Sequence, residues 1–97
     1  PALDRQAIGN LLLITREALD NAAEHADASR VAVSLRRSSP GFELVIQDDG
    51  VGYDERSTPR GAGIAAMAAA AARIGAALTV FSIPGMGTTV HVTFAEP

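Results

Sequence analysis

The apolar residues of this 97-residue chain change their spacing three times along its length. Residues 6–26 follow a helical period, residues 30–47 alternate, residues 64–74 are again helical, and residues 78–95 alternate. A turn sequence divides each alternating region, which is typical of an antiparallel hairpin. The chain is therefore predicted to form a helix, a hairpin, a second helix and a second hairpin, within one domain over residues 1–97.

Composition restricts the functions that such a domain can have. The chain has no cysteine, which excludes disulfides and thiolate metal sites. Its net charge of −3 and its lack of a Lys/Arg run argue against nucleic acid or an anionic membrane surface as a partner. No apolar segment reaches the roughly 20 residues of a membrane span. Because the chain begins with Pro1 rather than Met, we expect it to be a domain excised from a longer protein.

The first helical segment is expected to bury one apolar face. Its stripe consists of Ile8, Leu11, Leu12, Thr15, Ala18, Leu19, Ala22 and Ala26. On another face Glu17 and Asn21 lie four residues apart, one turn above the other, where their oxygens suit a hard cation such as Mg²⁺. A solvated polar face explains the same two residues, and the helix alone favours that interpretation. His25 is interpreted as a packing or helix-end residue.

The first hairpin turns at Ser38-Ser39-Pro40-Gly41 and ends in Asp48-Asp49-Gly50-Val51-Gly52. A carboxylate only accepts hydrogen bonds, so Asp48 at the strand end would select a donor such as an exocyclic amine, or hold a cation. Gly50 and Gly52 would let the backbone bend tightly and approach a flat ligand. An acidic turn without a ligand explains the same sequence, and the motif alone favours that simpler interpretation.

A polar segment, residues 54–63, separates this motif from the second helix and is predicted to be a mobile loop. It ends in Gly61-Ala62-Gly63, so the unpaired N–H groups of the helix would point into the loop. Such a helix start binds anions, above all phosphates, and a plain hinge is an equally good explanation. The stripe of this helix consists of Ile64, Met67, Ala71 and Ile74, and Gly75 ends it.

The second hairpin comprises residues 78–83 and 88–95, joined by Pro84-Gly85-Met86-Gly87. The sequence Gly85-Met86-Gly87-Thr88-Thr89 lacks the lysine of a P-loop, which excludes a Walker-type nucleotide site. His91 stands alone on the polar face of its strand and is interpreted as a surface residue.

Taken in order, these motifs resemble the ATP-binding domain of the gyrase, heat-shock chaperone, histidine kinase and MutL superfamily. The chain is most similar to the catalytic domain of sensor histidine kinases. Residues 16–29 resemble the N box of the branch related to nitrate sensors and lipid-desaturase thermosensors, and Gly61-Ala62-Gly63-Ile64 with Met67 resembles its second glycine box. The resemblance covers residues 8–94. It implies an α/β (α+β) two-layer sandwich, with helices on one face of a mixed, mainly antiparallel sheet.

The resemblance also implies roles for the residues of the N box and of the first glycine motif. Asn21 would coordinate a Mg²⁺ that bridges the phosphates of ATP, and Glu17 would orient water or act as the base-like catalytic group. Asp48 would accept a hydrogen bond from the amine of adenine. Gly50 and Gly52 would bring the backbone close to adenine and ribose.

Further roles follow for the later motifs by the same resemblance. Gly61 and Gly63, with Ile64 in the same box, would hinge a lid over the phosphates. Thr88 would support Asp48 through a water molecule near the purine.

Four features depart from the family pattern. Asp49 stands where Asn is usual, and Glu24 where Lys or Arg is usual, so both are expected to add negative charge near a bound polyphosphate. Ala62 replaces a frequent His, and residues 68–70 are all Ala where a charged patch is usual. These changes are expected to affect affinity and docking rather than the identity of the site.

The resemblance implies a protein-histidine kinase that transfers the γ-phosphoryl group of ATP to a histidine on a dimerisation domain outside these residues, for relay to a response regulator. The isolated domain is expected to be a monomer that binds nucleotide without autophosphorylation. The full protein is expected to be a homodimer, cytoplasmic or the cytoplasmic part of a membrane-bound sensor. Two alternatives are an anti-sigma-type serine kinase, and a non-catalytic interaction module with a nucleotide site.

Overall fold

The structure of the chain is a computed structural model that describes residues 4–24, 26–38, 41–52 and 62–95. Its elements are α1 (Arg5–Glu24), β1 (Val31–Ser38), β2 (Gly41–Asp48), α2 (Ala62–Arg73), β3 (Ala77–Ile83) and β4 (Gly87–Ala95). The predicted order of helix, hairpin, helix and hairpin is therefore confirmed, with ends that differ by at most two residues. Among the described residues, neither helix has the length and apolar character needed to cross a membrane.

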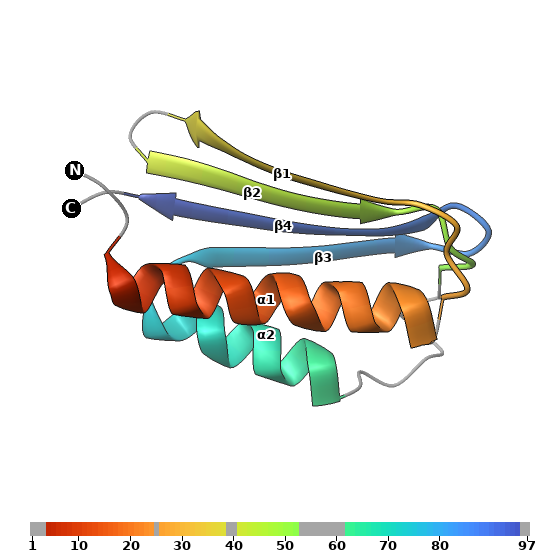
Figure 1. Cartoon of the computed structure of the whole chain (residues 1–97), viewed down its shortest axis with the longest axis horizontal. Helices are drawn as coiled ribbons and strands as arrows, with labels where there is room; N and C mark the ends of the chain where they lie inside the picture. Colours follow the sequence, from red (N-terminus) through yellow and green to blue (C-terminus); the bar gives the residue numbers. More distant parts are fainter. Residues whose placement is uncertain (1–3, 25, 39–40, 53–61, 96–97) are drawn as a thin grey trace.

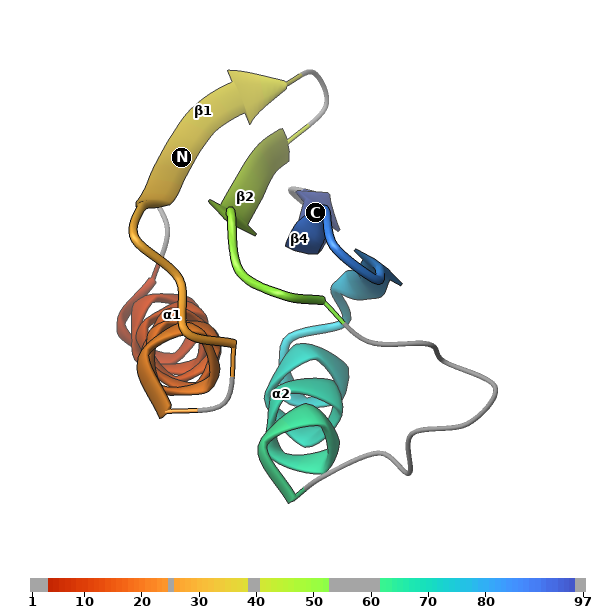
Figure 2. The ribbon, with the colours of Figure 1, turned by 90° about the vertical axis from the view of Figure 1, so that its right-hand side faces the viewer.

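The four strands form one sheet in the order β1-β2-β4-β3. All three pairs of neighbouring strands are antiparallel. Both helices cover the same face of this sheet (Figure 1), with α1 on the β1 side and α2 on the β3 side (Figure 2). The predicted two-layer α+β sandwich is thus confirmed, although the described strands contain no parallel pair of the kind that a mixed sheet would have.

Helix α1 begins with an N-cap, because the carboxylate of Asp4 accepts a hydrogen bond of 2.8 Å from the N–H of Ala7. The side of α1 that faces the protein interior is rotated from the predicted stripe. Its buried residues are Ala7, Leu11, Ile14, Ala18 and Ala22. Of the stripe residues, Ile8, Leu12 and Leu19 are exposed instead. Two overlapping apolar stripes exist on this helix, and the spacing alone does not say which one the sheet will cover.

The core lies between the helices and the two central strands. It combines Leu11, Ile14 and Ala18 from α1, Ile64, Met67, Ala70 and Ala71 from α2, and Leu44, Ile46, Val90 and Val92 from β2 and β4. The helices run antiparallel, since the Nε–H of Arg73 at the end of α2 donates a 2.8 Å hydrogen bond to the side-chain oxygen of Asn10 near the start of α1. Small alanines between them allow a close approach.

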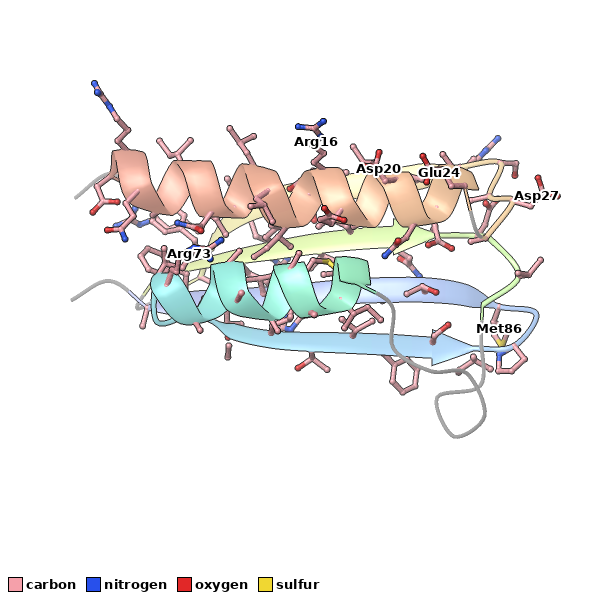
Figure 3. All side chains as sticks on the ribbon, turned by 90° about the horizontal axis from the view of Figure 1, so that it is seen from below. Arg16, Asp20, Glu24, Asp27, Arg73 and Met86 are labelled. Atoms are coloured by element: carbon pink, nitrogen blue, oxygen red, sulfur yellow. The ribbon has the colours of Figure 1, made fainter. Side chains whose placement is uncertain are left out.

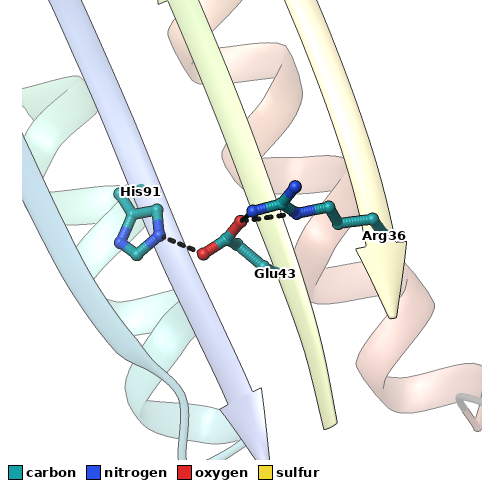
Figure 4. Close-up of polar contacts among 3 residues, drawn as sticks. All are labelled: Arg36, Glu43 and His91. Carbon is teal, nitrogen blue, oxygen red and sulfur yellow. Dashed lines mark hydrogen bonds and ion pairs between the residues drawn. The ribbon is translucent and has the colours of Figure 1, made fainter. Parts of the chain in front are cut away.

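The face of the sheet without helices carries a charged cluster across three strands (Figure 4). The carboxylate of Glu43 on β2 lies 2.9 Å from His91 Nε2 on β4 and 2.9 Å from the guanidinium of Arg36 on β1. The hydrogen bond from His91, and then that from Arg36, lowers the pKa of Glu43. His91 is a surface residue as predicted, but it is paired, and it lies on the face opposite the helices.

Candidate functional site

Four segments that are distant in the sequence meet at one end of the molecule. They are the C-terminal end of α1, the end of β2, the start of α2 and the β3–β4 turn (Figure 2). The residues after β2 connect them, since Val51 N–H donates to the carbonyl of Ala26 at 2.8 Å and Gly85 N–H donates to the carbonyl of Val51 at 2.6 Å. Every described site residue predicted from the sequence belongs to one of these segments or to the strands and helices that end there.

Asp48 is the last residue of β2 and its side chain is only 9 % exposed. Strand alternation turns it toward the helices, on the same side as Leu44 and Ile46. Its Oδ1 accepts hydrogen bonds from the N–H of Gly50 at 2.8 Å and from the N–H of Thr88 at 3.2 Å. No described residue donates to Oδ2. Within the described residues, the carboxylate is therefore held in one orientation through Oδ1, and Oδ2 is the acceptor that a hydrogen-bond-donating ligand would need.

The glycines that follow Asp48 are required by the protein's own packing. A Cβ at Gly50 would lie 2.5 Å from the carbonyl oxygen of Ala26, and a Cβ at Gly52 would collide with the carbonyl of Ile83. Gly52 also has a φ of +66°, in the left-handed region that favours glycine. The sequence explained these glycines by a close ligand, but contacts between segments of the chain already account for both.

Gly87 is a further necessary glycine, which stands beside Thr88 among the motifs of the resemblance but was given no role of its own. Its φ is +93°, and a Cβ there would collide with the carbonyl of Asp48. It lets the start of β4 pass directly beside the end of β2. Its place in the Pro84–Gly87 turn and its pairing with Thr88 marked it in the sequence, but neither signal predicted the contact with Asp48.

Glu17 and Asn21 meet the first turn of α2. A Cβ built on Gly63 would lie 3.1 Å from Glu17 Oε2, 3.2 Å from Asn21 Oδ1 and 3.4 Å from Asn21 Nδ2. Both α1 side chains are half-buried at this contact. Two oxygens beside a helix start combine cation ligands with N–H groups that can bind an anion.

A metal ion at this position would need ligands beyond the two side chains. Within the described ranges, no three His, Cys, Asp or Glu side chains group closely enough to hold an ion. Mg²⁺ suits such a sparse protein site, because it takes one or two protein oxygens and completes its coordination with phosphates and water.

Thr88 contacts Asp48 directly, through its backbone N–H, rather than only through water as the resemblance implied. Its hydroxyl lies 2.9 Å from the hydroxyl of Ser82, and the Ser82 oxygen lies 3.3 Å from the carbonyl oxygen of Gly87, so the one Ser82 proton has two possible acceptors. Ser82 is 9 % exposed and was not predicted as a site residue. The available signal was a hydroxyl at a position of β3 where the alternation calls for an apolar residue.

The carboxylate of Asp49 is held by the connection between α1 and β1. It accepts hydrogen bonds from the N–H of Ser29 at 2.8 Å, the hydroxyl of Ser29 at 2.6 Å and the N–H of Arg30 at 2.9 Å. The bond from the Ser29 hydroxyl, followed by that from Arg30, lowers the pKa of Asp49. Its charge was expected to oppose a polyphosphate, but three donors on the opposite side from Asp48 stabilise it.

The remaining predicted residues take different places. Glu24 lies with Arg16 and Asp20 along the edge of α1 that is remote from α2 (Figure 3). Ile64 is 9 % exposed and its side chain is part of the core, so only its backbone is available to a ligand. His25 and Gly61, and with Gly61 nearly all of the predicted loop, lie outside the described residues.

A separate hollow of about 360 Å³ lies at the other end of the sheet. It is lined by Ser38, Gly41, Phe42, Gly75, Ala77, Thr93, Phe94 and Ala95. None of these described lining residues has a charged side chain.

Comparison with known sequences identifies relatives over almost the whole chain. The family described as "Histidine kinase-, DNA gyrase B-, and HSP90-like ATPase" matches residues 7–97. The nitrate/nitrite sensor protein NarQ of Escherichia coli is 42 % identical over 95 residues, which are 96 % of this chain and 17 % of NarQ. The sensor protein VraS of Staphylococcus aureus is 32 % identical over 84 residues, which are 86 % of this chain and 24 % of VraS. The chain thus spans less than a quarter of these relatives.

Solved structures agree. The histidine kinase domain of a blue-light activated histidine kinase from Erythrobacter litoralis superposes with a TM-score of 0.79 and 26 % identity, covering 93 % of this chain and 45 % of that one. The ATP binding domain of PrrB from Mycobacterium tuberculosis has a TM-score of 0.77 and 28 % identity, covering 92 % of this chain and 68 % of that one. The chain therefore belongs to the histidine kinase-, DNA gyrase B- and HSP90-like ATPases, as a histidine kinase-type ATPase domain.

Proposed function

We propose that this domain binds Mg·ATP and is the catalytic part of a protein-histidine kinase. It donates the γ-phosphoryl group to a histidine of a dimerisation domain, from which the phosphoryl group passes to a response regulator. The observation that carries the proposal is the buried Asp48, whose Oδ1 accepts two backbone N–H groups while Oδ2 has no donor among the described residues.

Adenine supplies the donor that Asp48 lacks. Its exocyclic amine can donate to Oδ2, and a hydrogen bond to an ionised carboxylate is stronger than one between neutral groups. Because Oδ1 is already fixed by two N–H groups, no reorientation is needed when the purine enters. Gly50 and Gly52 contribute by allowing the backbone after Asp48 to pack closely against Ala26 and Ile83.

The phosphates belong at the contact between α1 and α2. There Asn21 would hold Mg²⁺, which when bound neutralises phosphate charge, and Glu17 would orient or deprotonate the attacking group. The start of α2 at Gly63 offers N–H groups to phosphate oxygens, together with Gly61 of the preceding loop. This arrangement is supported by the short distances from Gly63 to both side chains.

Phosphoryl transfer requires an acceptor from outside the described residues. His91 lies on the sheet face opposite the helices and is paired with Glu43. We propose that the acceptor is a histidine of another domain, whose ring nitrogen forms a bond to the γ-phosphorus as the bond to the β-phosphate oxygen breaks and ADP leaves. We propose that the isolated domain is a monomer. We also propose that the full protein is a homodimer, either cytoplasmic or the cytoplasmic part of a membrane-bound sensor, as the resemblance to sensor histidine kinases implies.

Asp48→Asn tests the adenine site by calorimetry with a non-hydrolysable ATP analogue, with and without Mg²⁺. The amide oxygen is expected to stay with the two N–H groups, which places the amide NH₂ against the adenine amine. Losing a hydrogen bond to a charged group costs about 1.5–3 kcal/mol, so affinity should fall roughly 10- to 100-fold.

Glu43→Gln is the matched control, because it removes a carboxylate from the same strand on the opposite face of the sheet. It should change affinity less than about threefold, a small effect by the usual conversion of energy to affinity. Equal losses in both variants, or no nucleotide binding by the wild type, would overturn the proposal. Covalent phosphate on the purified 97-residue domain would overturn the assignment of the acceptor to another domain.

A further inference from the structure

We propose that Ser82 is a positioning residue of the nucleotide site, which donates its proton to the hydroxyl of Thr88 and so leaves the Thr88 proton for the ring nitrogen beside the adenine amine. This inference rests on the proposed ATP site at Asp48. No family motif quoted above includes Ser82, which enters through the contacts of β3 with β4.

Ser82, Thr88 and Asp48 form a row across three neighbouring strands. Ser82 is the register partner of Thr88 in the β3–β4 pair. Thr88 in turn reaches Asp48 on β2 through its N–H, at 3.2 Å from Oδ1. A ligand that donates to Oδ2 of Asp48 therefore has Thr88 as the next side chain along the row, and Ser82 behind it.

Packing alone does not explain a serine at this position. The alternation of β3 places Leu78, Val80 and Ser82 on the helix side of the sheet, where the first two pack against the core. A buried hydroxyl is costly unless it forms hydrogen bonds, and an alanine would fill the site without that cost. Ser82 meets the cost through Thr88 and the carbonyl of Gly87.

The distances from Ser82 to its two neighbours indicate which of them receives the hydroxyl proton of Ser82. The Ser82–Thr88 contact of 2.9 Å lies in the normal range for two hydroxyls, whereas the 3.3 Å contact with Gly87 is longer than that range. A hydroxyl has one proton, so when Ser82 donates to Thr88, the proton of Thr88 is released from that contact. Thr88, whose N–H already binds Oδ1 of Asp48, then also offers a hydroxyl proton to a ligand.

This pair of groups matches one edge of adenine. The amine of adenine is a donor, and the adjacent ring nitrogen N1 is an acceptor. Oδ2 of Asp48 accepts from the amine while the Thr88 hydroxyl donates to N1, directly or through one water molecule. Without Ser82 the Thr88 hydroxyl is free to rotate, so the donor is no longer fixed toward N1.

The test measures the coupling between Ser82 and N1 by calorimetry with Mg²⁺ and three ligands, ADP, 1-deaza-ADP and 7-deaza-ADP. For the wild type, replacing N1 by carbon should weaken binding about 5- to 20-fold, the loss of one hydrogen bond. Ser82→Ala should weaken ADP and 7-deaza-ADP by about threefold or more and leave 1-deaza-ADP unchanged within error. Ser34→Ala, an exposed serine of β1, should change none of the three.

A merely structural role of Ser82 predicts equal losses for all three ligands, and that result would overturn the inference. Thr88→Val provides a second test that does not depend on Ser82→Ala alone. Adding Ser82→Ala to Thr88→Val should cause no further loss of ADP affinity. If the two substitutions lower ADP affinity independently, Ser82 does not act through the Thr88 hydroxyl. If the wild type does not bind ADP at all, the proposed function itself fails, so the two failures are distinguishable.

Discussion

Two adjacent carboxylates, Asp48 at the end of β2 and Asp49 directly after it, have different hydrogen-bond partners. Asp48 faces the helices and is buried, and among the described residues only its Oδ1 accepts hydrogen bonds. Asp49 is exposed and binds Ser29 and Arg30, which join α1 to β1. The first residue is a candidate for binding, and the second fixes the segment that leads from the N box into the sheet.

Asp49→Asn should lower the thermal stability at pH 7 by removing the charge that Ser29 and Arg30 stabilise. The pKa of Asp49 is lower in the folded state than the ordinary value of about 3.9. The charged Asp49 carboxylate therefore stabilises the folded state above pH 4, and this stabilisation is lost as the pH falls through the lowered pKa. The difference in Tm between wild type and variant, measured from pH 7 to pH 3, should narrow toward the acid end.

Nucleotide affinity gives the control for this variant. Since Asp49 binds the α1–β1 connection, Asp49→Asn should alter affinity for an ATP analogue less than about threefold, in contrast to Asp48→Asn. A Tm difference that widens in acid, or a gain in affinity of tenfold, would contradict this role and support the repulsion expected from the sequence.

For individual residues, the sequence indicated which side chains could bind a ligand more clearly than it indicated which residues contact one another. The acceptor at Asp48 followed from its residue type and its place at a strand end. The reasons for Gly50, Gly52 and Gly87 did not, because each glycine is required by a carbonyl from a distant segment. Ser82 was missed for the same reason, since its partner becomes evident only when the register of β3 and β4 is known.

At the scale of elements, both helices and all four strands were predicted, since each has a clear periodicity. The buried side of α1 was only partly right, because Ile14 is fully buried and was left out of the predicted stripe. The contact on which the proposed function depends is the one between α1 and the start of α2, where Gly63 leaves space for two polar side chains.

Gly63→Ala should lower nucleotide affinity without lowering the thermal stability of the domain. Alanine is a better helix former than glycine by up to about 1 kcal/mol, so the Tm should be unchanged or higher. The added Cβ would press on the ends of Glu17 and Asn21, which must move by a few tenths of an ångström. Affinity for the Mg²⁺ complex of an ATP analogue should therefore fall about 3- to 10-fold, by calorimetry.

Gly9→Ala is the matched control on the other helix, since nothing lies within 4 Å of a Cβ at that position. It should raise the Tm without a change in affinity. Unchanged affinity in Gly63→Ala would show that the contact with Glu17 and Asn21 has no part in binding.

At the scale of the whole molecule, a small aliphatic core holds two layers together. Its largest fully buried side chains are Ile14, Met67 and Val92, one each from α1, α2 and β4. The sequence predicted which hairpins form but not that β2 and β4 are neighbours, because that pairing joins residues far apart in the chain. It is this pairing that brings Thr88 to Asp48.

The two methionines of the chain offer a matched comparison of core and surface. Met67 is 1 % exposed and Met86 is 73 % exposed. Met67→Ala should reduce the free energy of unfolding by about 2–5 kcal/mol, because it leaves a cavity between α2 and the rest of the core. Met86→Ala should change it by less than about 0.5 kcal/mol. Urea denaturation measures both, and equal losses would contradict the arrangement of the core.

The hydrogen bond between Thr88 and Asp48 spans forty residues of sequence and thereby sets when the site can form during synthesis. A nascent chain that has emerged only as far as α2 contains Asp48, Glu17 and Asn21, but Asp48 then ends a strand with no β4 beside it. At the proposed adenine site, ATP would stabilise this domain only after β4 has left the ribosome and paired with β2. Nucleotide binding at that site would therefore stabilise the completed fold and not the earlier stages of folding.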